Sequence, residues 1–152
     1  MAKIILGVVV ALALASAGAA QTDCLFKEYD INDLVSILQG EGYGSIEILD
    51  ESRIKFKVEG LPYLLLLMDD GDLQMFCGFA GARLAFEDIN DWNQKTRLNK
   101  AYIDEEQDPV MTSDLLANAG INEEIVKQFV GIFVHSFGPD FRRFVNERNR
   151  AR

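Results

Sequence analysis

The chain has few of the residues on which most catalytic and metal sites depend. Its 152 residues include one histidine and two cysteines, and they contain no glycine pattern of the kind that cradles nucleotide phosphates. A serine or cysteine nucleophile would have to use His135, which lies in an apolar helical pattern with no nucleophile motif nearby, so we assign it a structural role. The cysteines are too far apart for a recognised zinc spacing. We therefore predict that the protein is not an enzyme and uses no metal or cofactor.

Basic residues are also scarce. There are 15 lysines and arginines against 24 aspartates and glutamates, which gives a net charge of −9. A protein with this negative charge repels the phosphate backbones of nucleic acids, so we expect no nucleic-acid partner. The exception is a basic C-terminal tail from Arg142 to Arg152. It could contact an anionic lipid or an acidic partner, but we favour compensation of a helix dipole.

One apolar run exceeds ten residues, and it lies at the N-terminus. Lys3 precedes the apolar segment Ile4 to Leu14, and the small residues of Ala15 to Ala20 follow it. This order is typical of a secretory signal peptide, and the run is too short to span a bilayer. We expect residues 1–20 to be removed near Ala20, with Ala17 and Ala19 as alternatives. Residues 21–152 would then form one periplasmic or secreted domain without a stable membrane anchor.

The two cysteines, Cys24 and Cys77, have two possible states. In an oxidising compartment they could form a disulfide that adds roughly 3–4 kcal/mol by the chain-entropy estimate. Alternatively, Cys77 is a buried free thiol, because it lies in a strand-like run. Both states stay open at this point.

Hydrophobic periodicity predicts an α+β domain whose mainly antiparallel sheet has helices on one face, in the order α-ββββ-α-ββ-α. We expect helices over Asp30 to Leu38 and Phe86 to Leu98, and a third that begins at the cap Asn122. The expected strands are Ser45 to Leu49, Arg53 to Val58, Leu61 to Met68, Leu73 to Phe79, Ala101 to Asp104 and Pro109 to Leu115. Gly138 and Pro139 predict a kink or an interruption of the last helix before Phe141 to Arg152.

Two apolar features bear on binding. Tyr63 to Leu67 has no polar face, so we expect it to be covered on both sides, by helices or by a second subunit. Trp92 has the register of a core anchor rather than of a ligand platform. A small molecule or lipid would instead need a cavity between sheet and helix, lined by Phe76, Phe79, Phe86 and Trp92. The acidic loops at 69–72 and 104–108 lack the spacing of an EF-hand, and we expect them to be hairpin turns.

The segment Ile89 to Val110, INDWNQKTRLNKAYIDEEQDPV, resembles the central motif of the YbjN-domain family, described as bacterial sensory transduction regulators. The motif residues are Asn90, Trp92, Asn93, Arg97, Tyr102, Asp104 and Pro109. The resemblance implies a fold similar to type III secretion chaperones, which commonly dimerise and bind proteins without doing chemistry. Here Cys77 lacks the hairpin partner that some exported relatives have, and Gln107-Asp108 replaces a frequent glycine.

Together these features predict a noncatalytic, extracytoplasmic protein-interaction domain with a regulatory or chaperone-like role, a protein partner and self-association as a homodimer. The alternative is a small-molecule or lipid-binding protein of the cell envelope. For Asn90, Asn93 and Arg97 we favour a structural role over recognition, because such side chains often satisfy backbone groups at junctions between a helix and a strand.

Overall fold

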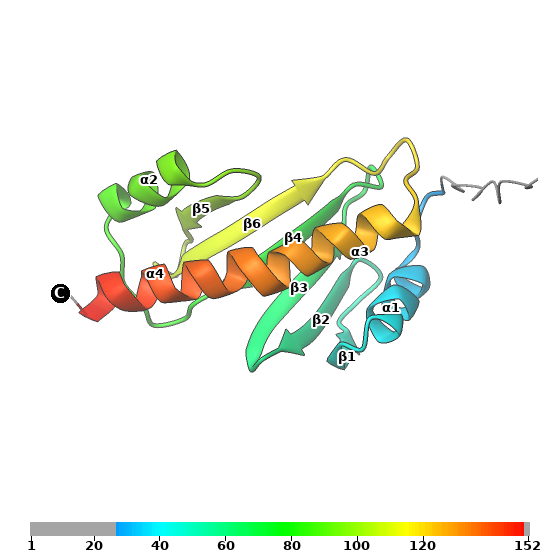
Figure 1. The fold of residues 1–152 in the computed structure, drawn as a ribbon, viewed down its shortest axis with the longest axis horizontal. Helices are drawn as coiled ribbons and strands as arrows, with labels where there is room; N and C mark the ends of the chain where they lie inside the picture. The colour runs from blue at the N-terminus through cyan, green and yellow to red at the C-terminus, as the bar shows by residue number, and fades with distance from the viewer. Residues whose placement is uncertain (1–26, 151–152) are drawn as a thin grey trace, which may run out of the picture.

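The structure is a computed structural model that describes residues 27–150 (Figure 1). Six antiparallel strands form one sheet in the order β1-β2-β3-β4-β6-β5. The strands are β1 (Gly44–Ile48), β2 (Arg53–Val58), β3 (Leu61–Leu67), β4 (Leu73–Gly78), β5 (Lys100–Ile103) and β6 (Pro109–Leu115). The helices are α1 (Ile31–Gly40), α2 (Phe86–Lys95), α3 (Glu123–Ile132) and α4 (Gly138–Arg150), with a π-helical turn η1 (Phe133–Phe137) between the last two. The predicted α+β class and element order are confirmed.

Alternation along β2 separates the two faces of the sheet. Ile54 and Phe56 are fully buried against the helices, while Arg53, Lys55 and Lys57 point to the opposite face. Directly opposite residues of antiparallel strands share a face, so this assignment extends to every paired strand. We call the face that carries the β2 cations the open face. It is turned away from the viewer in Figure 1, where the long helix formed by α3, η1 and α4 lies in front of the sheet.

Capping and burial explain where the helices begin and how they pack. Asp30 caps α1 by accepting hydrogen bonds from the backbone N–H groups of Asn32 (2.8 Å) and Asp33 (2.9 Å). This places Leu34 and Leu38 on the inner side of the helix, where both are fully buried. The capping side chain satisfies backbone donors that the first helical turn leaves without partners.

The α-helical pattern is interrupted just before Gly138 and Pro139, as the sequence predicted, but the interruption is a π-helical turn rather than a break in the chain's helical course. The chain runs from α3 through η1 into α4 as one continuous helical element across the sheet (Figure 1). Proline cannot donate the hydrogen bond that an α-helical interior requires. The wider π-helical turn lies immediately before it, and the Gly138 N–H bonds to the Phe133 carbonyl. The irregular turn therefore absorbs the local disruption without ending the helix.

Within the described residues, helices cover one side of Tyr63 to Leu67, and cover of the other side by a second subunit stays a prediction. Tyr63 and Leu65 point into the helical core and are buried. Leu64 and Leu66 lie on the open face and are only partly buried. The apolar run thus supplies both a core and a partly exposed surface.

The predicted signal peptide (1–20) and Cys24 lie outside the described residues. In the described part of the chain, none of the helices has the length and apolarity needed to traverse a membrane.

Candidate interaction surface

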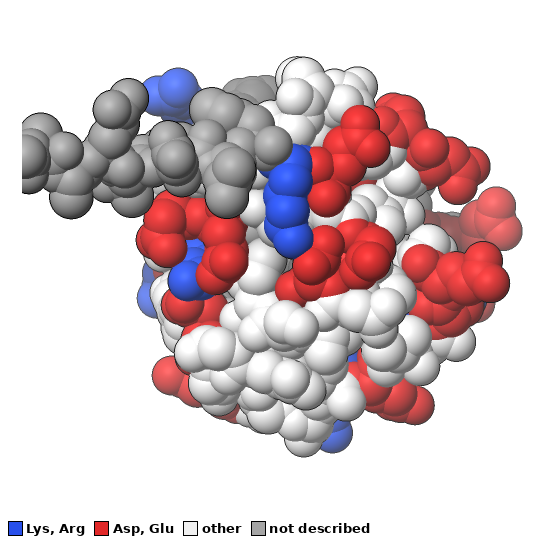
Figure 2. All heavy atoms as spheres, turned by 90° about the vertical axis from the view of Figure 1, so that its right-hand side faces the viewer, with Lys and Arg blue, Asp and Glu red and all other residues white. Residues whose placement is uncertain are grey.

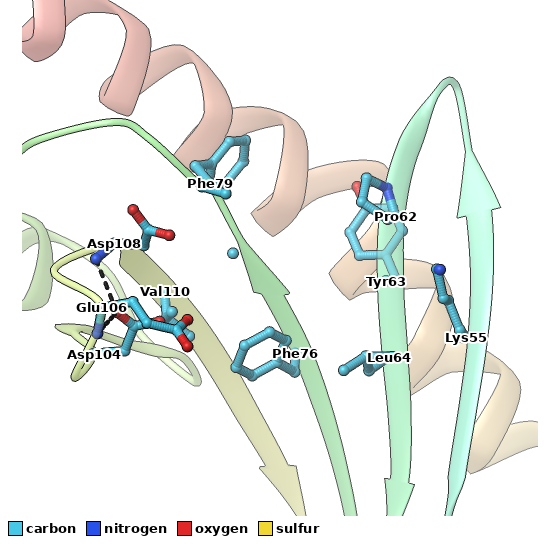
Figure 3. A pocket seen from close by; sticks show the side chains of 12 residues that line it. Lys55, Pro62, Tyr63, Leu64, Phe76, Phe79, Asp104, Glu106, Asp108 and Val110 are labelled. Carbon is cyan, nitrogen blue, oxygen red and sulfur yellow. Dashed lines mark hydrogen bonds between the residues drawn. The ribbon is translucent and has the colours of Figure 1, made fainter. Parts of the chain in front are cut away.

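A shallow trough of about 350 Å³ lies on the open face, towards the end of the sheet that carries the β5–β6 turn (Figure 3). Leu64 of β3, Phe76 of β4 and Val110 of β6 form its floor. Gly78 keeps this floor low, because a Cβ atom there would contact Val110 at 3.5 Å and Phe76 at 3.6 Å. The absence of a side chain at one strand position therefore creates part of the hollow.

The two sides of the trough carry opposite charges. Lys55 lies at the β2 side, and the carboxylates of Asp104, Glu106 and Asp108 lie at the other, with the apolar floor between them (Figure 3). Lys55 has one ion-pair partner, Glu47, at 3.8 Å. Neighbouring Lys57 points to the same face and makes no ion pair with any described residue. The arrangement can bind an apolar group that carries charges of both signs at its edges.

The acidic turn that bounds the trough is built by its own carboxylates. One Asp104 oxygen accepts the backbone N–H groups of Glu106 (3.0 Å) and Asp108 (2.8 Å). Gln107 has a φ of 67°, in the left-handed region that favours glycine, which is the residue the resemblance led us to expect nearby. Side-chain bonding by Asp104 holds the chain in this conformation without glycine.

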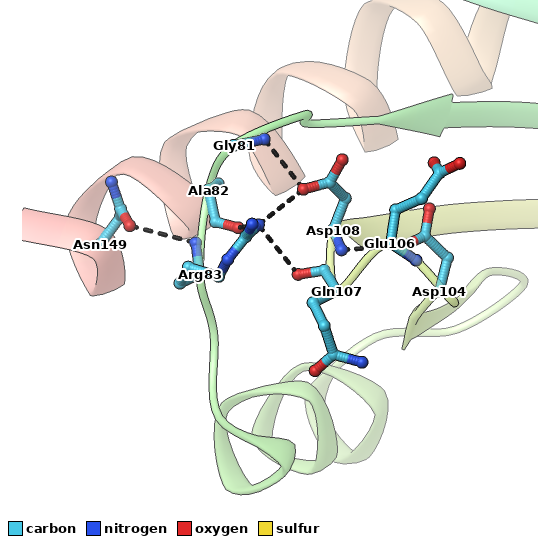
Figure 4. Close-up of polar contacts among 8 residues, drawn as sticks. All are labelled: Gly81, Ala82, Arg83, Asp104, Glu106, Gln107, Asp108 and Asn149. Carbon is cyan, nitrogen blue, oxygen red and sulfur yellow. Dashed lines mark hydrogen bonds and ion pairs between the residues drawn. The ribbon is translucent and has the colours of Figure 1, made fainter.

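Asp108 ties this turn to a loop distant in sequence (Figure 4). It accepts the backbone N–H of Gly81 (2.9 Å) and forms an ion pair with Arg83 (2.7 Å), whose guanidinium also donates to the carbonyl of Gln107 (3.2 Å). The hydrogen bond from Gly81 and the contact with Arg83 lower the pKa of Asp108 below its usual value. Asn149 of α4 accepts the N–H of Arg83 (3.2 Å), so the end of the long helix joins the same network.

Three acidic oxygens, one each from Asp104, Glu106 and Asp108, lie within 4.8 Å of one another. Two of these groups already bond to backbone N–H groups or to Arg83. Their arrangement is accounted for by the turn itself, as the sequence predicted.

The motif residues divide between core, junction and surface. Trp92 is buried, and its ring lies 5.0 Å from that of Phe141 and 5.3 Å from that of Phe144, which confirms the core-anchor prediction. Asn93 bonds twice to Ala101, donating to its carbonyl (3.0 Å) and accepting its N–H (2.8 Å). The structural role favoured for Asn93 is therefore confirmed, since it joins α2 to β5.

The remaining motif residues are not brought to one place. Asn90 and Arg97 are exposed on or just after α2, and Pro109 is buried at the start of β6. Tyr102 lies on the open face, 39% exposed, and partial burial raises the pKa of its hydroxyl. Of the seven residues, Tyr102 and Asp104 lie beside or within the trough wall.

The predicted ligand cavity between sheet and helix is wrong. Phe76 and Phe79 line the trough, Trp92 packs against α4, and Phe86 is 74% exposed. Sequence periodicity could not reveal this, because alternation along β4 fixes only that Phe76 and Cys77 face opposite ways. Cys77 takes the core side and is buried, without a disulfide partner among the described residues, and burial raises the pKa of its thiol to about 12. Its pairing with Cys24 stays a prediction.

Two further residue groups lie away from the trough. His135 is exposed on η1, with its ring 6.1 Å from that of Tyr43.

Arg148 of the basic tail pairs with Asp88 (3.3 Å) and Asp91 (3.1 Å) of α2, so this cation joins two helices. At the opposite end of the molecule, where α1 lies and α3 begins, most of the charged side chains are carboxylates (Figure 2).

The described residues thus form an α+β domain in which helices cover one face of an antiparallel sheet. A trough with an apolar floor and charged sides lies on the other face. The chain belongs to the YbjN family, whose model, described as "putative bacterial sensory transduction regulator", matches residues 30–146. No curated protein and no solved structure matches the chain significantly. That description names a regulatory role and no enzymatic activity. The likeness to type III secretion chaperones stays a prediction.

Proposed function

We propose that this chain is a noncatalytic regulatory domain that acts outside the cytoplasm by binding proteins, including a second copy of itself. The observation that carries the proposal is the open face, where Leu64, Phe76 and Val110 form an apolar floor beside charged side chains. Partly exposed apolar surface rimmed by charge is the usual composition of a protein-binding site. The regulator family and the signal-peptide pattern at residues 1–20 support the same role.

A noncatalytic role agrees with the chemistry of the trough. The titratable residues that line it are Lys55, Tyr63, Asp104, Glu106 and Asp108, with Tyr102 beside them, and the sole histidine lies elsewhere, on η1. The carboxylates Asp104 and Asp108 hold backbone groups in place, which favours fixed structure over proton transfer.

The test is crosslinking of the tagged full chain in cells, followed by affinity capture and sequencing of the N-terminus of the recovered protein. We expect cleavage near Gln21 and a protein recovered in near-stoichiometric yield, which can be a second copy. The proposal fails if the purified protein stays monomeric at high concentration and also captures no protein in the compartment where it accumulates.

A small molecule or lipid is the second candidate occupant, because about 350 Å³ lies within the range of small-ligand sites. Native mass spectrometry of the purified protein distinguishes a bound small molecule or lipid from a bound protein. A bound small molecule whose removal lowers the melting temperature would favour this second function.

A further inference from the structure

We propose that two copies of this chain pair through their open faces, related by a two-fold axis that runs parallel to the strands between β3 and β4. This inference rests on the proposed function, because it assigns one protein partner to the same surface. It goes further in naming the surface, the symmetry and the residues that meet.

The apolar part of the open face lies at the centre of the sheet. In the order β1-β2-β3-β4-β6-β5, the third and fourth strands are central, and they supply Pro62, Leu64, Leu66 and Phe76 to this face. Leu64 and Phe76 are directly opposite each other in the register. Two such faces stacked about 10 Å apart would bury these side chains against their symmetry mates.

The lysines of β2 and the acidic turn lie on opposite sides of this apolar centre, and Lys57 and the turn lie near the same end of the strands. Lys57 of β2 shares a cross-strand row with Pro62, and the same row continues through Gly78, Val110 and Tyr102. The acidic turn, Asp104 to Asp108, follows that row at the β5–β6 side. The face therefore has a basic side and an acidic side at one level along the strands.

A two-fold axis parallel to the strands makes this pattern self-complementary. Rotation about it exchanges the places of β2 and β6 and of β1 and β5, while each residue keeps its level along the strands. Lys57 of one copy then lies beside the acidic turn of its partner, and the contact occurs twice. An axis across the strands would instead place lysines over lysines, which like-charge repulsion disfavours.

The rest of the surface gives a reason for copies to meet at this face. The net charge of −9 makes two copies repel each other at long range. Figure 2 shows that most of the charged side chains at the end formed by α1 and the start of α3 are acidic, so contact there would bring carboxylates together. On the open face, Lys57 makes no ion pair with any described residue, and the side chain of Glu106 has no hydrogen-bond or ion-pair partner among residues 27–150. Each is available to a second copy.

Charge reversal with mixing tests the proposal in the full-length chain, purified from the compartment in which it accumulates. We expect wild-type protein to form dimers in sedimentation velocity runs over a concentration series. Lys57→Glu alone and Glu106→Lys alone should each raise the dimer dissociation constant at least about tenfold, because each variant places like charges at both symmetric contacts. An equimolar mixture of the two variants should recover the dimer, because both contacts then join opposite charges.

Two matched variants control for the change in net charge. Lys95→Glu on α2 and Glu147→Lys on α4 alter exposed side chains of helices that pack against the other face, and both should leave the dimer intact. Circular dichroism and melting curves establish that all four variants fold. The proposed interface is overturned if both open-face variants dimerise on their own as wild type does. It is also overturned if their mixture stays monomeric while wild type dimerises.

The experiments distinguish failure of the self-pairing inference from failure of the proposed function. A wild-type chain that is monomeric at every concentration overturns the self-pairing inference outright. If that monomer still captures a different protein in cells, and Lys57→Glu or Glu106→Lys abolishes the capture, the proposed function stands and the occupant of the open face is that other protein.

Discussion

Gly138 is the position where an ordinary helix-stabilising substitution should have the opposite effect. Gly138→Ala in a helix normally stabilises by about 1 kcal/mol, because alanine has the higher helix propensity. Here, a Cβ atom would lie 2.7 Å from Cε1 and 2.9 Å from Cζ of Tyr63, and closer still to its hydroxyl oxygen. Carbon atoms pack favourably only at about 3.5 Å or more, so something must move.

Tyr63 has little room to move. It is 1% exposed, and its ring lies 5.9 Å from that of Phe56 and 6.0 Å from that of Phe133. Its hydroxyl donates a hydrogen bond to the Val134 carbonyl (3.3 Å). Overpacking costs about 1–3 kcal/mol and losing the buried hydrogen bond about 1 kcal/mol. After the propensity gain, we expect Gly138→Ala to lower the free energy of unfolding by about 2 kcal/mol.

Thermal and urea unfolding followed by circular dichroism measure this effect. At roughly 3–5 °C for each kcal/mol in a domain of this size, the melting temperature should fall by about 6–10 °C. Gly131→Ala is the matched control, since a Cβ atom there meets nothing within 4 Å, and it should stabilise the protein. Equal stabilisation by both substitutions would refute the packing argument at Tyr63.

Three further predictions concern single side chains. Thr112→Val should raise the free energy of unfolding by about 1 kcal/mol, because the buried Thr112 hydroxyl finds no hydrogen-bond partner among residues 27–150, and a lower melting temperature would contradict this. Asp108→Asn should destabilise the protein at pH 7. The pKa of the Asp108 carboxyl is lower in the folded than in the unfolded protein, so the charged carboxyl stabilises the fold above a pH of about 4. This stabilisation is lost as the pH falls through the pKa of the folded state. Equal pH profiles of unfolding for variant and wild type would count against that. Cys77 should react slowly with a thiol reagent in native protein and quickly once unfolded, because burial raises its pKa, whereas fast native labelling would show an accessible thiol.

Patterns within short segments could predict the elements and, in β2, which side chains face the core. The alternation of Ile54 and Phe56 with lysines identified β2, and Asp70-Gly71 identified the β3–β4 hairpin. The helical register of Trp92 with Ile89 placed both in the core. In each case the physical signal lies within a few residues, so no knowledge of distant contacts was needed.

Contacts between distant segments could not be predicted. The bonds from Arg83 to the acidic turn join residues 24 and 25 positions apart, and Arg83 lies in a loop without periodicity. The continuity of the long helix through Pro139 depends on the π-helical turn beside Tyr63 of β3. Likewise, the leucines of β3 gave no indication of which face the helices would leave open, because both faces are apolar in sequence.

The most direct test of the open face as the protein-binding surface is site-specific photocrosslinking in cells. A photoreactive residue in place of Leu64 lies on the floor of the trough, and one in place of Asn146 lies on the exposed side of α4 and serves as the control. We predict a discrete protein adduct, of the mass of two copies or of the chain with another protein, from position 64 and not from position 146. No protein adduct from position 64, or the same adducts from both positions, would contradict the account.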